Sequence, residues 1–271
     1  MYVQQAIAIL DSGVGGLTVV KEVMRQLPRE KIIYFGDTAR TPYGPRPSEE
    51  VKKFTEQMVD FLIQFNPKVI IIACNTATAA ALEYISQKVS IPVIGVIHPG
   101  ARAAISATAT GYVGVIGTVG TIRSGAYTTA LKQLSPYVDV VSHACPALVP
   151  LVEQGLFRSE TTSQVVEESL RPIQTYPIDC LILGCTHYPF LKETIQEVMG
   201  PAVKLISSAD ETARETSTIL YNKGKLEAGD ETPVHQLFCS GDPELFQRIA
   251  AQWLGEQIRQ TPVVWQVTHL D

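Results

Sequence analysis

The chain has 271 residues, of which 45% are hydrophobic, and it carries a formal net charge of −5. This composition is typical of a globular protein with a substantial core and argues against a disordered or membrane-spanning chain. Lysine and arginine occur without basic runs, so we expect neither a nucleic acid nor a membrane as a partner and favour a small molecule. No apolar stretch approaches the ~20 residues of a membrane span, and the N-terminus lacks the pattern of a secretory signal, so we expect a cytoplasmic protein.

Short apolar runs rich in β-branched residues recur between amphipathic segments along the whole chain. This alternation predicts an α/β fold with mainly parallel sheets flanked by helices. The expected strands are Ala6 to Leu10, Ile32 to Phe35, Val69 to Ala73, Val93 to Val96, Tyr112 to Ile116, Val138 to Ser142, Leu181 to Leu183, Val203 to Ile206, Gln236 to Cys239 and Val263 to Val267.

The clearest helix follows Ser48 and ends before Asn66. Two glutamates suit its first turn, where the helix dipole favours negative charge. Its apolar residues fall on one face, which predicts a packing role; they are Val51, Phe54, Met58, Phe61 and Phe65.

The first strand runs into Asp11-Ser12-Gly13-Val14-Gly15-Gly16. A dinucleotide-binding loop would need a glycine at position 18, where Thr18 stands, so that interpretation fails. We expect the glycines to form a tight turn that approaches a small anion, with Asp11 and Ser12 facing a cleft. The alternative is that Asp11 merely caps the next helix.

Two segments, 69–76 and 180–187, read almost alike. Each is an apolar strand that ends in a cysteine, Cys74 or Cys185, followed by small polar residues and a predicted helix, 77–89 or 190–199. A helix N-terminus favours thiolate over thiol and can hold a carboxylate. The three other cysteines have the default role of small core residues: Cys145, Cys180 and Cys239.

The two halves look internally related, because a second strand runs into Gly117-Thr118-Val119-Gly120-Thr121. A duplicated α/β unit would give two pseudo-symmetric domains with the active site in the cleft between them, where the carboxyl ends of the strands meet. We expect residues 1–97 and 209–271 to form the first, discontinuous domain and residues 98–208 to form the second.

The cysteines include no C-x-x-C pair, and we expect them to be reduced. His143, Cys145, Cys185 and His187 are the residues that could form a zinc site, but structural zinc usually takes ligands separated by two to four residues, so we expect no metal. Pyridoxal phosphate would require a Schiff-base lysine, and no lysine lies in a motif comparable to the cysteine strand ends, so we expect no cofactor. Two symmetric cysteines also argue against a one-thiol hydrolase or decarboxylase and against a non-catalytic binding module.

Five motifs follow one another along the chain: Leu10-Asp11-Ser12-Gly13-Val14-Gly15-Gly16, Tyr34-Phe35-Gly36-Asp37 with Thr41-Pro42-Tyr43-Gly44, Ala73-Cys74-Asn75-Thr76-Ala77, Gly117-Thr118 with Thr121, and Leu183-Gly184-Cys185-Thr186-His187-Tyr188-Pro189. With them the chain resembles, over essentially its whole length, the glutamate racemases of the aspartate/glutamate racemase superfamily. The resemblance implies an isomerase that interconverts L- and D-glutamate without a cofactor and supplies D-glutamate for peptidoglycan. Racemisation of aspartate or of a broader set of acidic amino acids is the alternative. A homodimer stays open as the assembly.

The resemblance also implies roles for individual residues. Cys74 and Cys185 match the two acid/base residues, and Asp11, Glu153 and His187 match auxiliary polar groups of catalysis. The positions that match substrate-binding residues are Asp11, Ser12, Pro42, Tyr43, Gly44, Asn75, Thr76, Thr118, Thr121, Thr186 and His187. The chain departs from the family after Ile206, where it reads Ser207-Ser208-Ala209 and family members often have an aspartate before a serine; we expect this to affect a helix cap and not the chemistry.

Inversion of a stereocentre by proton transfer requires a base on one face of the α-carbon and an acid on the other. Two equivalent thiols on opposed walls suit this reaction, since the reference pKa of cysteine, near ~8.5, lets thiol and thiolate coexist close to neutrality. The chemistry of the residues thus agrees with the resemblance.

Overall fold

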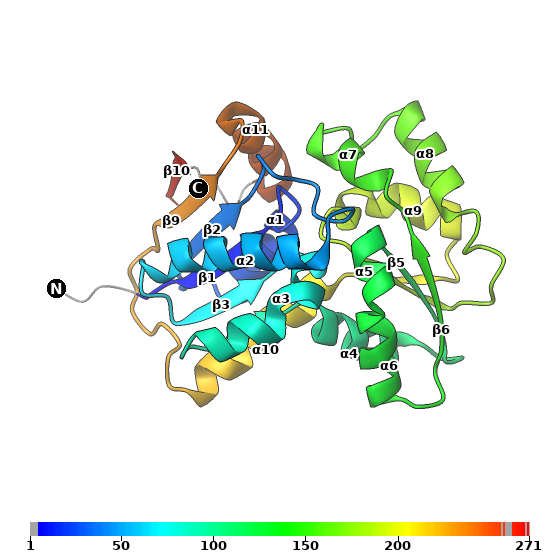
Figure 1. Ribbon diagram of the computed structural model, residues 1–271, viewed down its shortest axis with the longest axis horizontal. Helices are drawn as coiled ribbons and strands as arrows, with labels where there is room; N and C mark the ends of the chain where they lie inside the picture. The colour runs from blue at the N-terminus through cyan, green and yellow to red at the C-terminus, as the bar shows by residue number, and fades with distance from the viewer. Residues whose placement is uncertain (1–4, 256, 258–261, 269, 271) are drawn as a thin grey trace.

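The computed structural model describes residues 5–255, 257, 262–268 and 270. It contains two β-sheets side by side, each lying between helices (Figure 1). Every strand pair in the described residues is parallel. The predicted fold class, two α/β units with mainly parallel sheets, is therefore confirmed.

All ten expected strands are present, with ends that differ from the prediction by at most two residues. The six-stranded sheet has the order β10 (Val263–Val267), β9 (His235–Cys239), β2 (Ile32–Gly36), β1 (Ile7–Asp11), β3 (Val69–Ile72) and β4 (Val93–Gly95). The four-stranded sheet has the order β6 (Asp139–Ala144), β5 (Tyr112–Gly117), β7 (Cys180–Gly184) and β8 (Lys204–Ile206).

The two sheets share one topology. The order β2-β1-β3-β4 in one corresponds strand by strand to β6-β5-β7-β8 in the other. This is the arrangement that a duplicated unit predicts, and it makes β1 the counterpart of β5 and β3 the counterpart of β7. After β8 the chain returns to the first sheet, where β9 pairs with β2. The exact domain boundaries, at 97/98 and 208/209, stay a prediction.

Helices cover both faces of each sheet, and the central strands β1, β2, β3 and β7 are buried along their whole length. The helical segments are α1 (Leu17–Gln26), α2 (Ser48–Ile63), α3 (Asn75–Lys88), α4 (Ile97–Ala107), α5 (Val119–Ser124), α6 (Ala126–Leu134), α7 (Leu148–Glu153), α8 (Glu160–Leu170), the 3₁₀ turn η1 (Tyr188–Leu191), α9 (Lys192–Met199), α10 (Ser208–Asn222) and α11 (Pro243–Leu254). Helices α2 and α3 pack on one face of the first sheet, and α4 and α6 pack on one face of the second.

Helix α2 forms as its sequence predicts, with Ser48 as its first residue and Pro47 at the N-cap. Of the five apolar residues expected on its packing face, Val51 and Met58 are fully buried, while the three phenylalanines are partly buried against the same core. The face is completed by residues that the prediction left out, Thr55, Val59 and Leu62.

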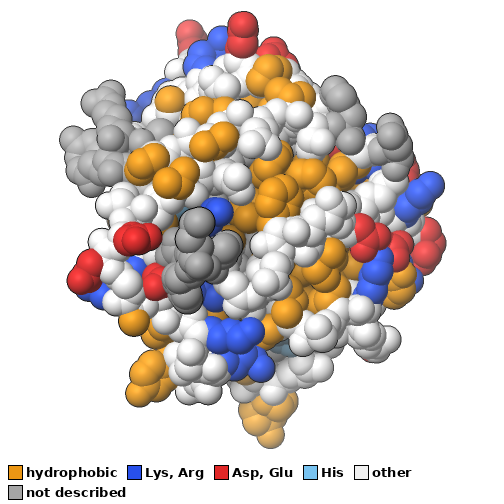
Figure 2. All heavy atoms as spheres, turned by 90° about the vertical axis from the view of Figure 1, so that its left-hand side faces the viewer, with side chains coloured by type: hydrophobic (Ala, Val, Ile, Leu, Met, Phe, Trp, Pro, Cys, Tyr) orange, Lys and Arg blue, Asp and Glu red, His pale blue; other side chains and the backbone are white. Residues whose placement is uncertain are grey.

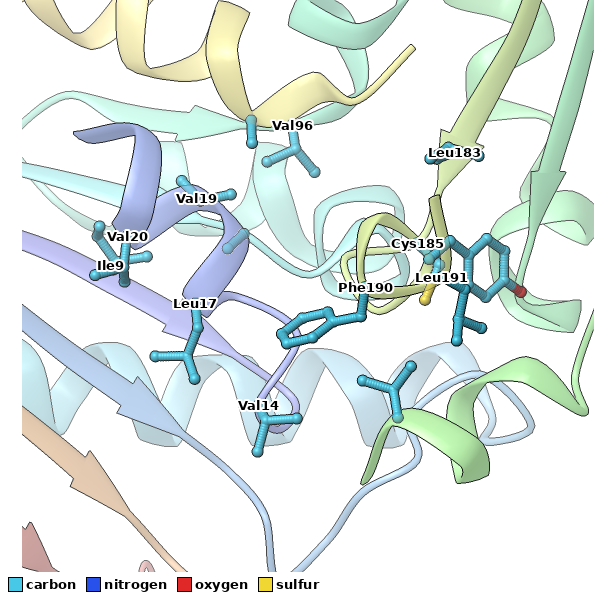
Figure 3. Packing of buried hydrophobic residues seen from close by; sticks show 14 of the residues in the cluster. Ile9, Val14, Leu17, Val19, Val20, Val96, Leu183, Cys185, Phe190 and Leu191 are labelled. Carbon is cyan, nitrogen blue, oxygen red and sulfur yellow. The ribbon is translucent and has the colours of Figure 1, made fainter. Parts of the chain in front are cut away.

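A single hydrophobic core passes from one sheet to the other. Figure 3 shows Phe190, which follows β7, pointing toward Val14 and Leu17, which follow β1. Leu17 is fully buried and Phe190 is 7% exposed. Apolar packing therefore joins the two units directly behind the strand ends that carry the cysteines.

Figure 2 shows the side of the molecule that lies at the left of Figure 1. Basic side chains on this face form small groups among acidic ones, and hydrophobic side chains form a band across it. Among the described residues, none of the helices combines the length and the apolar composition that crossing a membrane requires.

Candidate active site

The two cysteine strand ends open onto one small cavity between the sheets. Its walls come from both units and lie at the carboxyl ends of parallel strands, the usual place for ligands in open α/β sheets. The cavity volume is about 10 Å³, which is room for about one water molecule. The lining residues are Ser12, Pro42, Tyr43, Gly44, Cys74, Asn75, Thr76, Thr118, Val149, Cys185, Thr186 and His187.

Cys74 is the N-cap of α3, where its Sγ accepts a hydrogen bond from Ala77 N at 3.4 Å. Burial, and after it the charge of Asp11, raise the pKa of this thiol to about 12 in spite of hydrogen bonds from Ala77 and Ser12, which lower it. The helix N-terminus therefore does not lower the pKa of Cys74. In this nearly closed cavity the cost of removing a thiolate from water exceeds what one helix end supplies, which favours the protonated thiol.

Cys185 has a different environment. The predicted helix 190–199 is observed as η1 followed by α9, so Cys185 lies three residues before a 3₁₀ turn and does not cap an α-helix. Pro189 in the first turn of η1 suits a helix start, because proline lacks an N–H donor. The neighbour of this sulfur is instead a histidine: His187 Nδ1 lies 3.6 Å from Cys185 Sγ.

His187 connects Cys185 to Glu153. Its Nε2 contacts Glu153 Oε1, and the imidazole is 2% exposed. Burial alone would lower the pKa of His187, but the hydrogen bonds and negative charges of Cys185 and Glu153 raise it well above its ordinary value. A protonated His187 is thus placed to stabilise negative charge on the Cys185 sulfur.

Asp11 lies behind the cavity wall and is fully buried. Its Oδ1 accepts from Gly13 N and its Oδ2 from Thr186 Oγ1, both at 3.0 Å. Burial raises the pKa of this carboxyl to about 6, although the charge of His187 and both hydrogen bonds lower it. The alternative role as a helix cap is wrong, since Gly16 is the N-cap of α1 and, in the described structure, no side chain caps that helix.

Hydroxyl groups join the two units across one side of the cavity. Thr76 Oγ1, at the start of α3, lies 2.8 Å from Thr118 Oγ1 and 3.2 Å from Thr121 Oγ1. Beside them Gly120 N donates to Gly44 O at 2.8 Å. Thr121 does not line the cavity itself but holds the two threonines that do.

Tyr43 is fixed from behind by the buried carboxylate of Asp37, for which the sequence predicted no role of its own. The Tyr43 hydroxyl donates to Asp37 Oδ2, Arg40 Nε donates to the same oxygen at 2.6 Å, and Ser240 Oγ donates to Oδ1 at 2.7 Å. Ser240 and the lining residue Val149 were missed. Ser240 could have been found, because it follows the end of β9 as Ser12 follows the end of β1.

Asn75 brings a polar side chain into the cavity. Its Oδ1 accepts a hydrogen bond from Tyr127 OH at 2.7 Å, while its Nδ2 is buried and has no hydrogen-bond partner among the described residues. A buried, unpaired N–H group that lines a cavity is a donor available to a ligand oxygen.

All five cysteines are free in the described structure. No group of three or more His, Cys, Asp or Glu side chains among the residues described could hold a metal ion, so the zinc set of His143, Cys145, Cys185 and His187 does not form.

Comparison with known proteins agrees with this geometry. Residues 11–216 match the family model for Asp/Glu/hydantoin racemases. The glutamate racemase of Bacillus cereus is 53% identical and covers 98% of both chains, and that of Oceanobacillus iheyensis is 55% identical over 91% of this chain and 90% of its own length.

Solved structures give the same result. The crystal structure of glutamate racemase isoform RacE1 from Bacillus anthracis has a TM-score of 0.92 and 50% identity and covers 100% of this chain and 98% of its own. The glutamate racemase from Francisella tularensis, solved in complex with D-glutamate, has a TM-score of 0.89 and 35% identity over 99% of this chain and 98% of its own. The resemblance seen in the five motifs is confirmed, and the chain belongs to the Asp/Glu/hydantoin racemase family.

Proposed function

We propose that this protein is a glutamate racemase, an isomerase that interconverts L- and D-glutamate at the α-carbon without a cofactor. The observation that carries the proposal is the pair of buried cysteines, Cys74 and Cys185, which line one small cavity from opposite sheets. Relatives more than 50% identical over nearly the full length are glutamate racemases, which favours glutamate over aspartate. Such an enzyme would supply D-glutamate for peptidoglycan, in the cytoplasm, and a homodimer stays open.

In the proposed reaction one sulfur, as thiolate, removes the α-proton from one face of the substrate while the other, as thiol, donates its proton to the opposite face. One C–H bond breaks and one forms, and the two sulfurs exchange protonation states. By resemblance, Cys74 deprotonates D-glutamate and Cys185 deprotonates L-glutamate. His187 supports charge on Cys185, and Asp11 adjusts Cys74, so the two sides are chemically unequal although the fold is repeated.

The amino-acid α-proton is very weakly acidic, so alignment has to lower the barrier. Well-oriented proximity supplies roughly 7–11 kcal/mol, and fixed donors in a dry site strengthen electrostatic stabilisation of the carbanion-like transition state. A cavity of about 10 Å³ does not admit glutamate. We therefore propose that the two domains, 1–97 with 209–271 and 98–208, move apart to admit substrate and close around it.

The proposal predicts that purified protein racemises glutamate in both directions with a chelator present and no added pyridoxal phosphate. The direct measurement is proton NMR of L-glutamate in D₂O, in which the α-proton signal is lost as D-glutamate forms. We expect kcat/KM for aspartate to be at least about 100-fold lower, because a shorter side chain leaves polar groups of the site unpaired. Activity that needs a metal or cofactor would overturn the proposal, and equal kcat/KM for both substrates would move it to a broad-specificity racemase.

A second prediction concerns Gly13, which approaches Glu153 closely. A Cβ added at Gly13 would lie 2.1 Å from Glu153 Oε1, the atom that accepts a hydrogen bond from Val14 N and contacts His187. The end of the Glu153 side chain must then move away from His187. We expect Gly13→Ala to lower kcat about tenfold, because His187 loses the carboxylate that keeps it charged.

The double variant with Glu153→Gln tests this explanation. If Gly13→Ala acts through Glu153, the two changes together should cost hardly more than the larger one alone, since both remove the same contact. Fully additive losses in kcat would contradict it, and urea unfolding of each variant controls for a loss of folded protein.

A further inference from the structure

The side-chain amide of Asn75 lines the candidate active site, and only one of its two polar groups has a hydrogen-bond partner among the described residues. Its Oδ1 accepts from Tyr127, and its Nδ2 is buried and unpaired among the residues described. A buried donor without a partner costs about 1–3 kcal/mol, which a ligand oxygen placed beside it would recover. The amide can serve this purpose only if it keeps its N–H groups toward the cavity, since rotation by 180° would present the carbonyl oxygen instead.

Tyr127 is held in a tight slot. It lies on α6, which packs against the second sheet, and is 2% exposed, whereas Asn75 begins α3 beside the first sheet. A Cβ at Gly184 would lie 3.0 Å from Tyr127 Cε2, and one at Gly100 would lie 3.1 Å from its hydroxyl oxygen. The two glycines therefore make the room that the ring occupies, and their backbones limit its movement.

Ser208 lies beside the Tyr127 hydroxyl: a Cβ at Gly100 would lie 3.1 Å from the phenol oxygen and 3.2 Å from Ser208 Cβ. Burial raises the pKa of the Tyr127 phenol, negative charge at Cys185 raises it further, and a hydrogen bond from Ser208 acts in the opposite direction. The phenol itself donates its hydrogen to Asn75 Oδ1.

We infer that Ser208 and Tyr127 are positioning residues that fix the Asn75 amide with its N–H groups toward the cavity, so that this wall binds a carboxylate oxygen and disfavours an amide. The inference rests on the proposed function and adds to it a reason why an acidic amino acid is preferred to its amide. The Tyr127–Asn75 hydrogen bond joins the unit of the second sheet to the unit of the first. It therefore orients the Asn75 N–H groups when the two units are closed. The inference also gives a role to Ser208, which follows the position where the chain departs from its family.

The test is Tyr127→Phe, which keeps the ring and removes only the hydroxyl. We expect the KM and the Kd for L-glutamate, the latter measured by calorimetry, to rise about tenfold, the equivalent of one hydrogen bond of about 1.4 kcal/mol, while kcat stays within about threefold because the contact serves ground state and transition state alike. Ser208→Ala should shift KM in the same direction by a smaller factor. Tyr84→Phe is the matched control: it removes a phenol that donates to Glu56 far from the cavity, and KM should not change.

Amide analogues separate positioning from general damage. L-glutamine and L-isoglutamine, used as competitive inhibitors, replace one carboxylate each by an amide. In Tyr127→Phe the Asn75 amide is free to rotate, so the Ki of the analogue whose amide meets Asn75 should stay level or fall while the KM for glutamate rises. Equal weakening of glutamate and both analogues would show a merely structural role and overturn the inference.

A KM and Kd within twofold of wild type in a folded Tyr127→Phe protein would also overturn it. If that variant lost cooperative unfolding, Ser208→Ala would decide by the same criteria. Failure of the proposed function is distinguishable, because it concerns the wild type: a wild type that binds glutamate without racemising it contradicts the proposed function alone, and one that does neither contradicts both.

Discussion

Replacing either Cys74 or Cys185 by alanine is expected to lower racemisation of glutamate by about 1,000-fold or more in both directions. Every inversion needs one sulfur to remove the α-proton and the other to deliver one, so loss of either stops the same reaction; a positioned acid or base normally contributes 10²–10⁴-fold, and no other thiol lines the cavity. Serine variants should be nearly as inactive, because an alkoxide is far less accessible than a thiolate near neutrality.

The matched controls are Cys180→Ala and Cys239→Ala. Both cysteines are buried and free, and neither lines the cavity, so these variants lose the same atoms from the core and should keep kcat within about threefold.

In D₂O, early product from the wild type should carry deuterium at the α-carbon while remaining substrate keeps protium. A single variant at Cys74 or Cys185 with more than about a tenth of wild-type kcat, far above what loss of an acid or base leaves, would contradict the two-thiol mechanism.

The positions of these two side chains could be predicted because each depends on a local pattern. An apolar run ending in cysteine and small polar residues defines a buried strand that passes into a helix, and parallel strands present such ends at one edge of the sheet. The duplicated order of strands then brings Cys74 after β3 and Cys185 after β7 to one cavity.

The ionisation of the thiols could not be predicted in the same way. The helix N-terminus at Cys74 is real, but the pKa of its thiol rises because burial and Asp11 outweigh it, and burial is a property of the closed tertiary structure. His187 beside Cys185 was visible from a spacing of two residues. The third member of that chain, Glu153, lies on another helix, α7, and only the family resemblance pointed to it.

The groups that support the lining residues were the hardest to foresee. Asp37 fixes Tyr43 together with Ser240, which lies about 200 residues away along the chain, and Tyr127 fixes Asn75 from the opposite unit. No local pattern marks a tyrosine on an amphipathic helix as different from any other core residue. Such contacts are set by how two separately predictable units pack together.

The second large effect is expected at Asp11, where activity and stability should change in opposite directions. The negative charge of Asp11 raises the pKa of Cys74 and thereby favours the protonated thiol. In Asp11→Asn this charge is lost, and we expect kcat to fall about 100-fold, within the range found for groups that assist proton transfer. The loss should be greatest when D-glutamate is the substrate, because Cys74 is then the base. Without the charge of Asp11 the pKa of Cys74 falls, and its thiolate is a weaker base.

Stability should change with pH in a defined direction. The pKa of Asp11 is about 6 in the folded protein and has an ordinary value of 3.8, so the folded state binds this proton more tightly than the unfolded state. The contribution of Asp11 is therefore fully present below pH 4 and is lost as the pH rises through about 6, a change on the order of 3 kcal/mol. Asparagine has no such titration. The free energy of unfolding of Asp11→Asn minus that of wild type, measured in urea, should thus increase by on the order of 3 kcal/mol between pH 4 and pH 7.5, while titrating groups that do not interact with Asp11 cancel in the difference.

A variant that is more stable at pH 7.5 and much less active would show that the buried carboxylate is kept at a cost to the fold because the reaction uses its charge. The opposite result, a less stable Asn variant whose difference from wild type does not depend on pH, would mean that Asp11 is held for its hydrogen bonds to Gly13 and Thr186. Its charge would then not be what adjusts Cys74, and the difference between the two thiols would have to arise from His187 alone.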